Sequence, residues 1–151
     1  MRVTVRANLQ KLEAFVVKQP ETQDRILDRF KAEGGRETLT YMRAIMPIGK
    51  TGQLVESTIV HETAKGFSVY PTVTYAKFVN EDTRPHLIIP RYALALRWEQ
   101  DPFGIPRFAK SVRHPGTTGQ HFIERTRDAM RSVLREILRL IAKEEIGEDM
   151  R

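Results

Sequence analysis

The sequence predicts an α+β fold: a small, mostly antiparallel sheet of about four or five strands, packed by an N-terminal helical pair and one long C-terminal helix. Apolar residues recur at helical spacing at both ends of the chain, and short strand-like runs are clustered between these ends. The strands do not alternate with helices, which disfavours a doubly wound sheet. With 151 residues, 40% of them hydrophobic, the chain is long enough for one domain, taken as residues 1–151, with one modest core.

Two helices are expected at the N-terminal end. Residues 8–18 carry apolar side chains at helical spacing, and Pro20 then suits the first position of a second helix. That second helix is predicted to run from Pro20 to Met46, because Pro47 disfavours helical geometry in the residue before it. The adjacent glycines Gly34 and Gly35 weaken it, so we expect a kink there or the close approach of another backbone.

The middle of the chain is predicted to hold short strands joined by turns. The expected strands are Leu54–Thr63, Phe67–Val73, Leu87–Ile89, Leu94–Trp98 and Phe108–Arg113. Ala64–Gly66 is expected to close a hairpin between the first two strands. Tyr75–Val79 fits one helical turn and a continued strand equally well. The expected loops are Ile48–Gly52, Glu99–Arg107 and His114–Gly119, which are rich in Gly or Pro.

The last and longest helix is predicted over Gln120–Ile146. Its apolar residues form a wide stripe, and the opposite side alternates in charge. Gly147 is the expected stop, and residues 148–151 are expected to fray. This helix carries a net charge of only +1, which is typical of a solvated face.

The formal net charge of the chain is +6, and most of the excess lies in the loop-rich middle. Between residues 84 and 114 six basic side chains face two acidic ones, a balance of +4. A basic surface of this kind can contact nucleic acid or an acidic protein, or can simply keep the protein soluble. The candidate residues for a DNA or acidic-partner contact are Arg84, Arg91, Arg97, Arg107, Lys110 and Arg113.

No catalytic, cofactor-binding or metal-binding residue is nominated. Gly49-Lys50-Thr51 resembles the end of a phosphate-binding loop, but the first glycine of that motif and the preceding strand are missing. His61-Glu62 lacks the second histidine of a zinc-protease motif. A metal-dependent hydrolase built on His86, His114 and His121 is the weakest hypothesis, because the spacing of these histidines is not that of metal ligands. The chain has no cysteine, so it has no disulfide and no thiolate ligand.

The sequence predicts no membrane span and no secretory signal. No apolar run approaches the roughly 18 residues that a spanning helix needs. The first residues contain charge but no apolar core of the kind found in signal peptides.

Several short motifs in the middle of the chain together resemble one protein family. Their order is Pro47, Thr51-Gly52-x-Leu54-x-x-Ser57, Tyr75-Ala76-x-Phe78-Val79, Thr83-x-Pro85-His86, Ile89-Pro90, Trp98, Phe108-Ala109-Lys110-x-Val112, His114-Pro115-Gly116 and Phe122. This ordered set spans roughly residues 40 to 130. It is similar to the tailed-bacteriophage head–tail joining or tail-completion family of the phage neck, also called the "gene product ten" family.

One departure from the family pattern lies at Asn80-Glu81-Asp82, where the family tends to have a glycine before the threonine. If this turn requires a positive φ angle, Asn80 or Asp82 can supply it at modest cost.

The resemblance implies a structural virion protein without enzymatic activity or a cofactor. Such proteins form an oligomeric ring, hexameric or dodecameric, between the head connector and the tail. The implied partners are further copies of the chain, the connector or stopper, the tail terminator or tube, and DNA crossing the channel. The implied location is the head–tail interface of the virion, assembled in the bacterial host cytoplasm.

The residues agree with a role in assembly, because exposed Pro/Gly loops suit contacts that become ordered on binding. We expect the interface loops to present Phe103, Ile105, Arg107, Arg113 and His114. The alternative function is a basic DNA-binding module that uses the same middle part of the chain.

Overall fold

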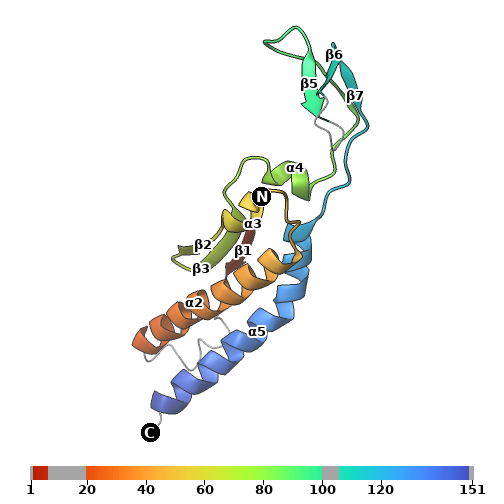
Figure 1. Ribbon diagram of the computed structural model, residues 1–151. Coiled ribbons are helices and arrows are strands. Elements are labelled where there is room, and N and C mark those ends of the chain that lie inside the picture. Colours follow the sequence, from red (N-terminus) through yellow and green to blue (C-terminus); the bar gives the residue numbers. More distant parts are fainter. Residues whose placement is uncertain (1, 7–19, 100–105, 150–151) are drawn as a thin grey trace. The chain divides into compact units, whose positions relative to one another are not determined.

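The computed structural model describes residues 2–6, 20–99 and 106–149 (Figure 1). Contacts between residues divide the chain into two compact units. The first, called here the helix–sheet unit, comprises residues 1–80 and 120–151, and the second, called the ribbon unit, comprises residues 81–119. The helix expected over residues 8–18 lies outside the described residues, and a single domain over residues 1–151 stays a prediction.

A three-stranded antiparallel sheet forms one layer of the helix–sheet unit. Strand β3 (Gly66–Pro71) lies in the centre, between β1 (Val3–Arg6) and β2 (Thr58–Thr63). The pairing of Thr63 with Gly66 confirms the hairpin predicted at this point. Strand β1 was not predicted from the sequence, because a run of four residues is too short for its alternation to stand out. Its Val3 is buried and pairs with Val69.

The segment expected to be one strand from Leu54 begins instead with a short helix, α3 (Gln53–Glu56). Gly52 precedes it with φ of 66°, and its carbonyl accepts hydrogen bonds from the amides of Val55 and Glu56. Strand β2 starts only at Thr58, whose hydroxyl donates to the carbonyl of Leu54. The local turn at Gly52 therefore overrides the strand preference of the first residues.

Helix α2 (Pro20–Ile45) confirms the long second helix, with Pro20 at its first position. The helix is continuous through Gly34 and Gly35, and both glycines are buried. A Cβ at Gly34 would lie 3.0 Å from Phe67 and from Leu134, and a Cβ at Gly35 would lie 2.9 Å from Val60. The expected close approach is therefore made by side chains of the sheet and of the last helix, not by another backbone.

Helix α5 (Phe122–Asp149) lies beside α2 in antiparallel orientation, as Figure 1 shows. Its predicted stop at Gly147 is wrong, because the helix continues to Asp149. Gly147 is not among the described residues with positive φ, the conformation with which a glycine ends a helix.

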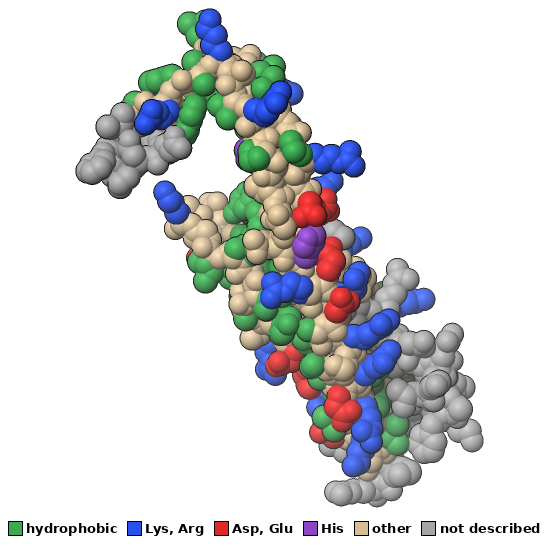
Figure 2. All heavy atoms as spheres, turned by 90° about the vertical axis from the view of Figure 1, so that its right-hand side faces the viewer, with side chains coloured by type: hydrophobic (Ala, Val, Ile, Leu, Met, Phe, Trp, Pro, Cys, Tyr) green, Lys and Arg blue, Asp and Glu red, His purple; other side chains and the backbone are tan. Residues whose placement is uncertain are grey.

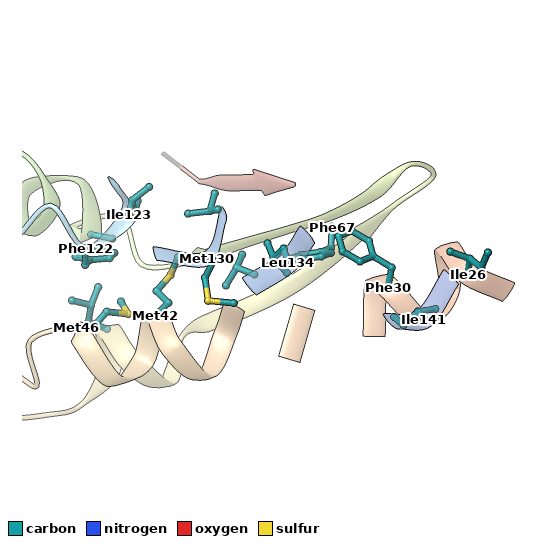
Figure 3. Packing of buried hydrophobic residues seen from close by; sticks show 14 of the residues in the cluster. Ile26, Phe30, Met42, Met46, Phe67, Phe122, Ile123, Met130, Leu134 and Ile141 are labelled. Atoms are coloured by element: carbon teal, nitrogen blue, oxygen red, sulfur yellow. The ribbon is translucent and has the colours of Figure 1, made fainter. Parts of the chain in front are cut away.

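The core of the unit lies between the two long helices and the sheet. Phe67 of β3 packs beside Phe30 of α2, with ring centroids 5.7 Å apart, and Leu134 of α5 lies on its other side (Figure 3). Further along the helices, Met42, Met130 and Phe122 are buried members of the same core cluster (Figure 3). Burial of such side chains contributes roughly 1.5–3 kcal/mol each, so this layer is the main source of stability.

The short helix α4 (Ala76–Asn80) resolves the choice left open for Tyr75–Val79 in favour of a helical turn. It ends at Asn80, which is fully buried. The possibility of positive φ at Asn80 or Asp82 is not realised, since the one described residue other than glycine with positive φ is His121. Asn80 has another structural role, which is to cap the start of α5.

The remaining strands form two separate ribbons within the ribbon unit. Strand β4 (His86–Ile88) pairs with β7 (Val112–His114), and β5 (Leu96–Glu99) pairs with β6 (Pro106–Ala109), both antiparallel. The fold is thus mixed, with small antiparallel sheets and a long C-terminal helix, but one sheet of four or five strands is not formed.

The predicted strand over Phe108–Arg113 is split at Lys110 and Ser111. Its first half belongs to β6 and its second half to β7, which pair with different partners. His114, expected to begin a loop, is the last residue of β7. In the expected loop over Glu99–Arg107, both ends are in strands and residues 100–105 lie outside the described residues.

Candidate functional site

The β4–β7 ribbon is closed at one end by polar contacts between its two flanking segments. The amide of Thr83 donates to the carbonyl of Thr117 at 2.9 Å, and the amide of Thr117 donates to the hydroxyl of Thr83 at 2.8 Å. The carboxylate of Asp82 accepts a hydrogen bond from the amide of Gly119 at 2.8 Å. These bonds hold the two ends of the ribbon unit together.

Two histidines stand opposite each other in this ribbon. His86 and His114 are cross-strand partners whose rings stack with centroids 5.1 Å apart. Nδ1 of His86 lies 2.9 Å from the carbonyl of Arg84, and Nδ1 of His114 accepts a hydrogen bond from the amide of Gly116. Both rings therefore contact the local backbone. His114 was assigned to a loop by sequence reasoning because its strand partner, His86, is distant along the chain.

Gly116 is required by the geometry of the turn that follows β7. Its φ is 87°, and a Cβ at this position would collide with the carbonyl oxygen of Thr83. The motif His114-Pro115-Gly116 thus has a local physical reason: it brings the chain back against the segment that precedes β4.

The main feature of the ribbon unit is its exposed apolar surface. Among its described residues no hydrophobic side chain is buried. Tyr92 and Leu94 are each 98% exposed, and Phe108 is 65% exposed. The full set of exposed large hydrophobic side chains is Leu87, Ile89, Tyr92, Leu94, Trp98 and Phe108. Green side chains on the surface of this unit are visible in Figure 2. A short segment that exposes this many large apolar side chains and buries none is a candidate interaction site.

The six predicted contact cations all lie in this unit and are exposed, namely Arg84, Arg91, Arg97, Arg107, Lys110 and Arg113. Within the described part of the chain none of them forms a salt bridge, whereas Arg25 and Arg29 of α2 and Arg127 and Arg139 of α5 do. Figure 2 shows this contrast in part, with red and blue side chains mixed over the helix–sheet unit.

The strand register shows which of these cations share a face with an aromatic ring. Arg97 stands opposite Phe108, and Trp98 stands opposite Arg107. Directly paired residues project to the same face of an antiparallel ribbon, and neighbours along a strand project to opposite faces. Each face of the β5–β6 ribbon therefore carries one aromatic ring and one arginine.

The predicted interface residues are placed only in part. Arg107 lies in β6, Arg113 and His114 lie in β7, and Phe103 and Ile105 lie outside the described residues. Sequence reasoning missed Tyr92 and Leu94 as surface residues, because apolar side chains were assigned to a sheet with a buried face. A run such as Leu94–Trp98 that lacks polar alternation on either face was the available indication.

The described residues contain no group of three His, Cys, Asp or Glu side chains placed to hold a metal ion. His86 and His114 are brought together by the sheet register, but both Nδ1 atoms are engaged with backbone groups. Over the same residues, no helix is long and apolar enough to span a bilayer.

The chain was also compared with known proteins. No protein-family model matches it, and no curated protein or solved structure matches it significantly.

Proposed function

We propose that this protein is a non-enzymatic assembly subunit of a tailed-phage neck, which closes an oligomeric ring between the head connector and the tail at the head–tail interface of the virion. The observation that carries the proposal is the ribbon unit: a folded segment that exposes six large hydrophobic side chains and buries none among its described residues. The ordered motifs over residues 40 to 130 support the phage assignment.

A protein segment of this kind is incomplete without a partner. Isolated two-stranded ribbons are at best marginally stable in water, because they have too little apolar surface to bury. Covering one exposed leucine contributes roughly 1.5–3 kcal/mol, so binding to a neighbour stabilises the ribbons as well as the assembly. The partner surfaces proposed are a further copy of the chain and the adjoining connector and tail rings.

A ring also requires two different surfaces on one subunit. Heterologous contacts join one surface of a subunit to another surface of its neighbour, and a closed rotation produces a ring. The chain offers a unit with its own core and a unit with exposed apolar side chains. The exposed apolar side chains of the ribbon unit support a ring in which this unit contacts the neighbouring subunit.

The test removes the ribbon tip and keeps the fold of the rest. Deleting residues 89–111 and joining Ile88 to Val112 through Asn-Gly retains the β4–β7 pairing, because these two residues are cross-strand partners and a two-residue turn fits a hairpin. We expect the purified variant to melt as the parent does, to form no ring by solution mass and negative-stain imaging, and to fail in joining heads to tails.

A point substitution with a matched control sharpens this test. Leu94→Gln changes a fully exposed aliphatic side chain of the ribbon unit, and Ile48→Gln changes one that is 80% exposed in the helix–sheet unit. Assembly is expected to weaken by about tenfold or more for Leu94→Gln, since the loss of one buried leucine exceeds 1.4 kcal/mol. Equal effects of both substitutions, or normal joining by the deletion variant, contradict the proposal.

A further inference from the structure

We infer that the free edge of β2 pairs with the same edge of a second copy of the chain, as antiparallel strands related by a two-fold axis at Val60. This contact lies in the helix–sheet unit, is separate from the ribbon unit and does not depend on ring formation. The inference starts from the sheet order, because β3 is the one strand that pairs with β2 in the described part of the chain. A six-residue strand that is open on one side can accept a further strand.

The register shows which backbone groups of β2 point away from β3. The amide of Thr72 donates to the carbonyl of Ser57 at 3.1 Å, and this bond continues the β2–β3 pairing by one residue. In an antiparallel pair, hydrogen-bonded and non-hydrogen-bonded residues alternate, so the odd-numbered residues of β2 bond to β3. The amides and carbonyls of Thr58, Val60 and Glu62 therefore point to the open edge.

Two charged side chains lie along this edge. Nη2 of Arg43 in α2 donates to the outward carbonyl of Thr58 at 2.8 Å, which places the guanidinium at the edge. Glu62 is exposed four residues further along β2. Neither Arg43 nor Glu62 forms a salt bridge among the described residues. Because a strand rises roughly 3.3 Å per residue, Glu62 lies about 13 Å from Thr58 along its own strand and is poorly placed to neutralise Arg43 of the same copy.

Pairing of two β2 edges about Val60 brings these charges together. When Val60 stands opposite Val60 of the second copy, Glu62 of each copy stands opposite Thr58 of the other. Val60 faces Gly35 of α2, so residues 58, 60 and 62 project to the side of the helices, where Arg43 also lies. Each Glu62 then meets Arg43 of the other copy, and the contact contains two equivalent ion pairs.

This register also forms the most hydrogen bonds between the two edges. With the strands centred on Val60, the outward residues pair as 58 with 62, 60 with 60 and 62 with 58. A shift by two residues in either direction leaves one of these pairs without a partner. A charge on an edge strand ordinarily discourages pairing with another chain. Here a second copy supplies the opposite charge, so Glu62 selects another β2 edge over an arbitrary strand.

The test uses the full-length protein and reverses each charge in turn. Arg43→Glu sets two carboxylates against each other in the pair of copies, and Glu62→Arg sets two cations against each other. Each variant alone should dimerise about tenfold or more weakly than the parent. An equimolar mixture restores opposite charges at both contacts. We expect sedimentation velocity and native mass spectrometry to show a mixed dimer, with one copy of each variant and about the parental affinity.

The matched control makes the same charge changes away from this edge. Arg131→Glu in α5 and Glu21→Arg in α2 alter exposed side chains of the long helices. Each should leave the dimer affinity within about twofold of the parent, since exposed charges beyond the Debye length are screened. All four variants keep the ribbon unit unaltered, so a ring contact contributes equally to every sample. Their melting temperatures show whether a loss of association comes from a loss of folding.

A pair of cysteines reads the register directly, because the chain has no cysteine of its own. In this pairing Ile59 stands opposite His61 of the second copy, and both side chains are exposed. Directly opposite residues are about 4.5–5.5 Å apart and diagonal ones about 7–8 Å, so a disulfide fits between positions 59 and 61 and not between two copies of position 59. A mixture of Ile59→Cys and His61→Cys should therefore cross-link far faster than either variant alone.

Three results would overturn the inference. One is a parent protein that stays monomeric up to roughly millimolar concentration, together with a cysteine mixture that does not cross-link. Another is a mixture of Arg43→Glu and Glu62→Arg that associates no better than each variant alone. The third is a faster cross-link of Ile59→Cys to Thr4→Cys than to His61→Cys, which would replace the two-fold contact by one between β2 and the β1 edge of the next copy. If a charge variant does not fold, the cysteine mixture still decides, because it alters exposed side chains alone.

Discussion

The side-chain oxygen of Asn80 accepts a hydrogen bond from the backbone amide of Ile123 at 3.0 Å, although the two residues are 43 positions apart. The amide nitrogen of the same side chain donates to Glu124 at 3.0 Å, and the carbonyl of Asn80 accepts from the amide of His121. A residue at the end of α4 thus accepts hydrogen bonds from backbone amides at the start of α5. This capping role usually belongs to the residue that directly precedes the helix.

Asn80→Ala should lower the free energy of unfolding by about 1–3 kcal/mol, because a buried amide of α5 loses its acceptor. Asn80→Asp keeps an acceptor oxygen for Ile123 but sets a carboxylate against that of Glu124. We therefore expect Glu124→Gln to restore part of the stability lost in Asn80→Asp and none of that lost in Asn80→Ala. Urea denaturation of the three single variants and the two double variants with Glu124→Gln measures this coupling; additive effects would contradict it.

Gly35→Ala should destabilise the protein even though alanine favours a helix over glycine by about 1 kcal/mol. Its Cβ would lie 2.9 Å from Val60, within a densely packed core that cannot absorb an extra methyl group. Val60→Ala should relieve the strain in the double variant. Gly147→Ala is the matched control, since nothing lies within 4 Å of its Cβ position, and it should stabilise by up to about 1 kcal/mol. Thermal melting distinguishes the two substitutions, and equal stabilisation by both would disprove the packing argument.

Glu145→Gln should weaken the contact between the start of α2 and the end of α5. Glu145 is buried, accepts a hydrogen bond from Arg29 at 2.9 Å and forms a salt bridge with Arg25 at 3.2 Å. Loss of hydrogen bonds to a buried carboxylate costs about 1–3 kcal/mol. Glu136→Gln, which breaks an exposed pair with Arg139, should cost less than about 0.5 kcal/mol. Chemical denaturation of both variants measures the two losses of unfolding free energy. Equal losses would show that the burial of Glu145 does not matter.

The pH dependence of this cluster follows from the sign of the arginine shift. The hydrogen bonds that Arg29 donates to the carboxylates of Glu145, then Glu144 and Glu33, raise its pKa above the ordinary value. A group whose pKa is raised in the folded state contributes stability that is present below its unfolded pKa and lost only above it. Between pH 6 and 10, roughly, Arg29 should add no pH dependence, so the stability lost in Glu145→Gln should be constant over this range. Denaturation at several pH values tests this.

Gly116→Ala should disrupt the ribbon unit and leave the helix–sheet core intact. The new Cβ would meet the carbonyl oxygen of Thr83 at a φ of 87°, which L-residues other than glycine rarely adopt. We expect faster amide hydrogen exchange at Thr83 and Thr117, while amides in α2 and α5 keep their protection. Uniformly faster exchange over both units would show that the ribbons and the core unfold together.

Much of the secondary structure follows from local features of the sequence. Pro20 begins α2, and the hairpin between β2 and β3 has the predicted turn. In the apolar stripe of α5, Phe122 and Met130 are buried as the periodicity indicates, whereas Val133 and Leu140 are exposed. These features depend on neighbours within a few residues, so the sequence contains them directly. The misplaced boundaries, at Gly52 and Gly147, lie where one backbone angle determines whether a helix forms or continues.

Sheet membership and surface exposure required the tertiary structure. Phe108 and Val112 are four residues apart and were assigned to one strand, yet they pair with different partners in different ribbons. No local pattern specifies a cross-strand partner, and short apolar runs were therefore merged into one sheet. For the same reason the exposure of Tyr92 and Leu94 was not predicted. Their apolar side chains suggested a buried core, but no hydrophobic side chain among the described residues of the ribbon unit is buried.

By itself, the sequence determined the two long helices, the β2–β3 hairpin and the basic middle of this protein, because propensity, periodicity and charge act over short distances along the chain. Only the tertiary structure decided that Asn80 caps α5, that Gly34 and Gly35 admit Phe67, Leu134 and Val60, and that each face of the β5–β6 ribbon pairs an arginine with an aromatic ring. These relationships join residues that are distant in sequence, and packing and strand register alone bring them together.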